Sequence, residues 1–138
     1  MLAKLLVAYD GSKQSEKAFG FALDIASKYS AKMLVLAVAR PPEPPVQVEM
    51  EAVLESAAQY YQEHFNRLSE QSAALGIEAV FQVKVGHPAE QIVQMAKVEQ
   101  ADAIVMGHRG ETLLQRWLLG SVAKRVLSYA HCTVIIVR

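Results

Sequence analysis

The chain has 138 residues, which is enough for one domain with a single core but not for two. Apolar residues make up 52% of it and charged residues 20%, a balance typical of a folded globular protein rather than a disordered one. Lysine plus arginine equals aspartate plus glutamate, so the formal net charge is zero and no broad basic field is available for a nucleic-acid backbone. We expect one domain over residues 1–138 and no nucleic-acid partner.

No apolar run approaches the length of about 20 residues that a membrane-spanning helix needs. The apolar stretch at the start is brief and ends at Asp10-Gly11 as a strand would, so we do not expect it to be a signal peptide. Cys132 is the single cysteine, which excludes an internal disulfide and suits a small core residue in a reducing compartment. These features predict a cytoplasmic protein without a membrane partner.

Short apolar runs recur along the chain and read as strands. The first, second, fourth and fifth are apolar almost throughout, as buried parallel strands are, whereas the third alternates and is expected nearer the sheet edge. The five predicted strands are Leu5–Ala8, Met33–Val38, Ala79–Val85, Ala103–Met106 and Thr133–Val137.

Segments of helical character separate these runs. Apolar residues from Ala18 to Tyr29 form one stripe, with Ser15 as the expected cap, and a longer helix is expected from Met50 to Leu75. The third helix should begin at Pro88 and the fourth near Gly120-Ser121. The expected apolar stripe of the long helix consists of Leu54, Ala58, Tyr61, Phe65, Leu68 and Leu75.

Strict alternation of strands and helices predicts an α/β fold with a parallel sheet and helices on both faces, because crossovers between parallel strands are right-handed. We expect the strand order 3-2-1-4-5. In such sheets ligands bind beyond the carboxyl ends of the strands where the winding direction reverses, here between the first and fourth strands.

Glycine and polar residues follow both of these strands. The first ends in Asp10-Gly11-Ser12, and the fourth in Gly107-His108-Arg109-Gly110. Gly120-Ser121 then begins the fourth helix, where backbone amides and the helix dipole favour a phosphate. The spacing is neither the dinucleotide G-x-G-x-x-G nor the P-loop pattern. These residues also have a purely structural explanation. Gly107 and Gly110 could simply form a turn at the end of a strand, and Asp10 could be a helix cap or turn residue.

The glycine pattern from Gly107 to Ser121 resembles the ATP-binding signature of the universal stress protein family. The segments Val7–Ser12, Gly86–Glu90 and His131–Val137 are also similar to parts of that family, so the resemblance spans the whole chain. It implies a Rossmann-like fold of the adenine nucleotide alpha hydrolase type.

The same resemblance implies a nucleotide site. Asp10 would lie near adenine and ribose, Val38 would read the adenine edge through its backbone, and Arg109 could pair with a phosphate. The backbone of the remaining residues would contact the ribose and the phosphates. The implied set is Asp10, Val38, Gly107, Arg109, Gly110, Gly120, Ser121 and Val122. We expect His108 to be a solvated loop residue and find no metal-ligand spacing among histidines and cysteine.

These residues favour an ATP-binding regulatory module whose nucleotide state alters its shape or partners. ADP and AMP remain open as the resident nucleotide, with Mg²⁺ held through the phosphates. The alternative is a slow ATPase or nucleotide-dependent enzyme, which normally needs a positioned lysine, a metal-binding acidic pair and a residue that orients the nucleophile. A structural, chaperone-like dimer without nucleotide is a third possibility.

The last predicted strand, Thr133–Val137, would lie at a sheet edge with no charge or proline. Such an edge invites pairing with another chain, so we expect a homodimer in which two copies pair these strands about a two-fold axis. The alternative is a monomer whose edge is covered by the last helix or by residues Leu113–Leu119.

Overall fold

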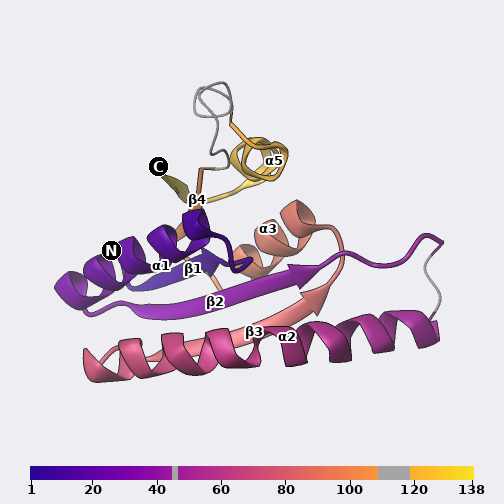
Figure 1. The fold of residues 1–138 in the computed structure, drawn as a ribbon. Helices are drawn as coiled ribbons and strands as arrows, with labels where there is room; N and C mark the ends of the chain where they lie inside the picture. The colour runs from indigo at the N-terminus through magenta and orange to yellow at the C-terminus, as the bar shows by residue number, and fades with distance from the viewer. Residues whose placement is uncertain (45–46, 109–118) are drawn as a thin grey trace.

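A computed structural model of the chain describes residues 1–44, 47–108 and 119–138. They form a parallel sheet in the order β3-β2-β1-β4-β5, with helices packed on both faces (Figure 1), so the predicted fold and strand order are confirmed. The elements are β1 (Lys4–Ala8), α1 (Lys13–Tyr29), β2 (Lys32–Ala39), α2 (Gln47–Ala74), β3 (Ala79–Val85), α3 (Pro88–Val98), β4 (Ala103–Gly107), α5 (Ser121–Tyr129) and β5 (Thr133–Val137). Within the described residues, no helix is long and apolar enough to cross a bilayer.

The central strands are buried on both faces because successive side chains point to opposite sides. In β1, Leu5 and Val7 pack with α1 and α2, whereas Leu6 packs with α3 and α5. All three are almost completely buried. The apolar runs in the sequence therefore supply two hydrophobic cores from one sheet.

The first helix begins at a different serine from the one we expected. Ser12 is the N-cap, and its Oγ accepts a hydrogen bond of 3.1 Å from the backbone N–H of Ser15. Ser15 lies inside the helix, buried, with its own hydroxyl bonded to the Ser12 carbonyl. The turn at Asp10-Gly11 is complete so soon after β1 that the helix can start at Lys13.

The apolar stripe of α2 is also displaced from the expected one. Tyr61 and Leu68 are buried as predicted, and Phe65 packs against the same core, but Leu54, Ala58 and Leu75 are exposed. The N-terminal end of α2 extends past the tips of β2 and β3 (Figure 1), and Leu54 in its N-terminal half is 41% exposed. The other buried positions are Ala57 and Ser72.

Candidate functional site

A crevice opens where β1 and β4 part. Their pairing ends at Val7 and Val105, although β1 continues beside β2 to Ala8, and β4 continues beside β5 to Gly107. The carboxyl ends of the two strands therefore lose their mutual hydrogen bonds at the position where the sheet changes its winding direction. This is the point where ligands bind in open α/β sheets.

A cavity of about 370 Å³ lies at this crevice. Its walls come from the carboxyl ends of β1, β2 and β4, the start of α1, and the first turns of α3 and α5. That volume is within the range of small-molecule sites. The bordering residues are Ala8, Tyr9, Asp10, Ser12, Gln14, Ser15, Leu36, Val38, Arg40, Pro88, Ile92, Met106, Gly107, Gly120, Val122 and Ala123.

The cavity brings together most of the residues singled out in the sequence, although they are far apart along the chain. Asp10, Val38, Gly107, Gly120 and Val122 all border it. Ser121 is the first residue of α5, next to the wall rather than among the residues that form it.

The two remaining candidates, Arg109 and Gly110, lie outside the described residues. Their place in a nucleotide site stays a prediction.

Gly107 has a packing role that the sequence did not reveal. A Cβ built on it would lie 2.6 Å from both the carbonyl carbon and the carbonyl oxygen of Gln14, in the first turn of α1. Backbone atoms at such a distance cannot move aside as a side chain can. Glycine is therefore required here for the close approach of α1 to β4, independently of any ligand.

The start of α5 supplies anion-binding groups. Gly120 is its N-cap in extended conformation, without a side-chain cap, and Lys124 N–H makes the first helical bond to the Gly120 carbonyl at 3.0 Å. The amides of Ser121, Val122 and Ala123 precede that bond, so the helix ladder does not use them. Because Gly120, Val122 and Ala123 border the cavity, the helix start faces it and can bind a phosphate.

Sequence reasoning missed Arg40, which borders the cavity at the end of β2. Arg40 is followed by a proline-rich stretch, which is typical of a surface loop, and its side chain is exposed. The position of Arg40 could have revealed it. β2 is next to β1 in a parallel sheet, so the residue that follows β2 must lie near the same crevice. Among the described residues of the wall, Asp10 and Arg40 carry the formal charges.

His108 is not solvated as we expected. It is 6% exposed, and its backbone N–H donates a 2.7 Å hydrogen bond to the Val137 carbonyl. The bond extends the pairing of β4 with β5 by one residue, which places His108 inside the protein. Cys132 is half-buried and packs beside the core of α3 and α5, where burial raises its thiol pKa. Within the described residues, no histidine, cysteine and carboxylate cluster could hold a metal ion.

A polar cluster lies on the other side of the β1–α1 turn. The Tyr9 hydroxyl donates to Glu16, and Arg67 of α2 donates to both carboxylate oxygens of Glu16, one of them at 3.2 Å. His64 Nδ1 lies 2.9 Å from the Tyr9 oxygen. The bonds from Arg67 hold the pKa of Glu16 below its ordinary value, while burial and then the bond to Glu16 raise the pKa of Tyr9.

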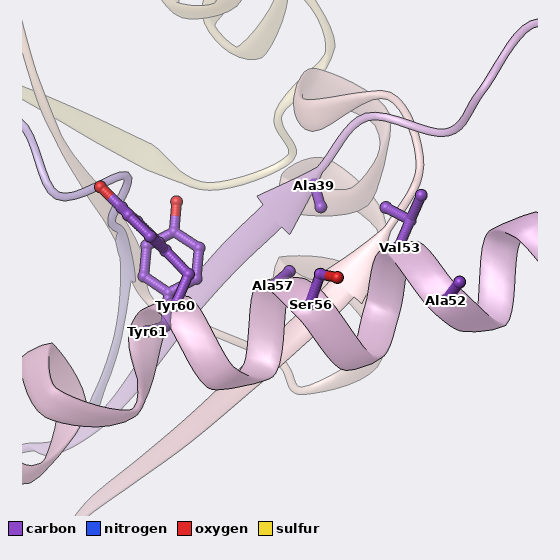
Figure 2. A pocket seen from close by; sticks show the side chains of 7 residues that line it. All are labelled: Ala39, Ala52, Val53, Ser56, Ala57, Tyr60 and Tyr61. Carbon is purple, nitrogen blue, oxygen red and sulfur yellow. The ribbon is translucent and has the colours of Figure 1, made fainter.

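A second hollow of about 470 Å³ lies between the end of β2 and the N-terminal half of α2 (Figure 2). It is lined by Ala39, Ala52, Val53, Ser56, Ala57, Tyr60 and Tyr61. None of these residues is charged, and α2 presents its flank rather than its N-terminus to the hollow. It therefore lacks the charged groups and the helix start that border the cavity at the strand ends.

Comparison with known proteins identifies the relatives of this chain. The model of the universal stress protein family matches residues 1–138. Universal stress protein MJ0531 of Methanocaldococcus jannaschii is 34% identical over 139 residues, covering 98% of this chain and 81% of that protein. The structure of hypothetical protein MJ0577 has a TM-score of 0.81 at 25% identity, covering 99% of this chain and 96% of the other. A universal stress protein in complex with cAMP has a TM-score of 0.75 at 26% identity, covering 99% and 97%.

Replacing Gly107 with alanine should destabilise the protein, because the new methyl group would meet the Gln14 backbone. Overpacking of this kind costs about 1–3 kcal/mol in unfolding free energy. Gly20→Ala in α1 is the matched control, since a Cβ there meets nothing within 4 Å. That change should stabilise the helix by roughly 0.5–1 kcal/mol. Urea unfolding measures both, and an unaffected Gly107→Ala protein would contradict the packing role.

The Glu16–Arg67 pair should make stability depend on acidity. The folded-state pKa of Glu16 is lowered from its ordinary value of 4.5, so the stabilisation is fully present above that value and is lost as pH falls through the folded-state pKa. The difference in unfolding free energy between the wild type and Glu16→Gln should therefore shrink in acid. In an Arg67→Met background the same comparison should show a smaller pH dependence. Denaturant titrations at pH values from neutral to well below 4.5 measure these free energies. An equal pH dependence of the Glu16→Gln effect in both backgrounds would refute the pairing.

Proposed function

The chain belongs to the universal stress protein family, and we propose that it binds ATP in the cavity between the ends of β1 and β4. We propose further that it acts as a nucleotide-responsive regulatory module in the cytoplasm rather than as a catalyst. Some solved relatives bind nucleotides, among them the cAMP complex that shares the fold over 99% of this chain.

One observation supports this proposal above all: a carboxylate, the backbone at the end of a strand and the start of a helix all border the same cavity. Asp10 lies in the turn after β1, Val38 near the end of β2, and Gly120 and Val122 at the start of α5. This arrangement offers acceptors for ribose hydroxyls at one end and free amides for phosphates at the other. We propose that Arg109, Gly110 and Ser121 complete the phosphate end.

Arg40 adds a cation at the β2 end of the same wall, on the side away from α5. Its guanidinium suits stacking on a purine ring. Leu36, Ile92 and Met106 line the apolar part of the wall. An aromatic base fits that lining better than a second phosphate group would.

Catalysis is the weaker proposal. Along the described part of the wall Asp10 is the single carboxylate, and lysine is not among the bordering residues. Phosphoryl transfer relies on positioned cations, a bound metal ion and a residue that orients the nucleophile. The described wall therefore supports binding better than turnover.

Gly120→Val should weaken ATP binding at least about tenfold, a change of about 1.4 kcal/mol, because a branched side chain would stand at the helix start facing the phosphates. Gly20→Ala, which lies in α1 outside the cavity wall, should bind like the wild type. Isothermal titration of the three proteins measures this. If the wild type fails to bind ATP, ADP or AMP, the proposed function is wrong. Unchanged affinity in Gly120→Val would place the phosphates elsewhere.

We also propose a homodimer through β5. This strand pairs with β4 on one side and is the last in the sheet order, and its residues Val134–Val137 are only half-buried. An apolar edge of this kind invites an antiparallel copy of itself. Ile135→Pro removes a backbone donor and should shift the protein toward the monomer. Sedimentation at micromolar concentration is the measurement, and a monomeric wild type would contradict the dimer.

A further inference from the structure

The nucleotide cavity and α2 are joined through two consecutive residues. Side chains alternate along β1 and its extension, so the Tyr9 side chain packs in the core with α2, although Tyr9 and its neighbour Asp10 both border the cavity. The backbone N–H of Tyr9 still pairs with the Leu36 carbonyl at 2.9 Å, which keeps this part of the chain strand-like. One peptide unit therefore separates Asp10 at the cavity from the contacts that the Tyr9 side chain makes with α2.

The Tyr9 hydroxyl is bonded to α2 through His64. The tyrosine hydroxyl has one proton, which it donates to the Glu16 carboxylate, because a carboxylate can only accept. The tyrosine oxygen must then accept from His64, so Nδ1 of His64 carries a proton. Tyr9 is 2% exposed, which makes this hydrogen bond costly to lose.

The second ring nitrogen of His64 faces the turn itself. A Cβ built on Gly11 would lie 3.6 Å from His64 Nε2 and 3.5 Å from the Tyr60 hydroxyl, so these two α2 side chains fill the space behind the turn. Gly11 has φ of +83°, a conformation that side chains disfavour. At the other end of the turn, Ser12 N–H donates to Asp10 Oδ1 at 2.9 Å. The turn is thus fixed by its own hydrogen bond and by α2.

We propose that His64 is a positioning residue for the nucleotide site and that it couples α2 to nucleotide occupancy. Among the described residues bordering the cavity, none comes from α2. His64 therefore acts through Tyr9 and the Asp10–Ser12 turn rather than on the ligand. Coupling between two sites is reciprocal, so a helix that stabilises the binding-competent turn must itself be stabilised when nucleotide binds. This inference rests on the proposed nucleotide binding.

Three variants of α2 separate positioning from general stability. His64→Phe keeps a ring but removes the bond to Tyr9, and it should weaken ATP binding about fivefold or more. His64→Asn returns a nitrogen donor near the position of Nδ1 and should restore much of the affinity. Leu68→Val removes a methylene from the buried face of α2 and should lower the melting temperature without changing ATP affinity. Calorimetric titration and thermal unfolding give both quantities for each protein.

Hydrogen exchange tests the reverse direction. Adding ATP to the wild type should slow amide exchange in α2 around residues 60–68, and this slowing should be lost in His64→Phe even at saturating ATP. If wild-type protein binds ATP while His64→Phe shows the same affinity and the same slowing, the coupling is wrong and the proposed function stands. If His64→Phe fails to fold, His64→Ala takes its place: weakened ATP binding with loss of the slowing in α2 supports the coupling, and wild-type affinity with the same slowing contradicts it. A wild-type protein that binds no adenine nucleotide defeats the proposed function itself.

Discussion

Parallel strands stay together only while their backbone hydrogen bonds continue, and those between β1 and β4 end at Val7 and Val105. Each strand goes on beside its outer neighbour, so the two carboxyl ends separate without exposing the core. The candidate site depends on this parting. It brings the turn after β1, the end of β4 and the starts of α1 and α5 to the wall of one cavity.

Close backbone packing keeps this opening narrow. Gln14 in the first turn of α1 approaches Gly107 so closely that a methyl group would not fit between them. The Ser12 cap fixes where α1 begins, and Tyr9 joins the same turn to α1 through Glu16 and to α2 through His64. A cavity built largely from backbone and helix starts is well suited to hold a polyphosphate, while its apolar lining suits a base.

Local patterns predicted the strands and the helix starts, whereas the resemblance to a known family supplied the five predicted residues that border the cavity. Apolar runs mark buried strands, and Asp10-Gly11 and Gly120-Ser121 mark turns and helix starts. The position of Ser15, the stripe of α2 and the burial of His108 could not be read in this way. The start of α1 depends on the length of the turn before it, whereas the other two depend on neighbours distant in sequence: the packing of α2 on the sheet and the continuation of the β4–β5 ladder. Arg40 was missed because the prolines that follow it are typical of a surface loop.

Binding of adenine nucleotide at the switch point is tested most directly by mapping the backbone amides by NMR. We expect ATP to shift the amide signals of Asp10–Ser12, Gly107 and Gly120–Ala123, while those at the amino ends of the strands, such as Lys4 and Ala103, stay in place. Shifts confined to the hollow between Ala39 and Val53, or the absence of any shift at millimolar ATP, would contradict it.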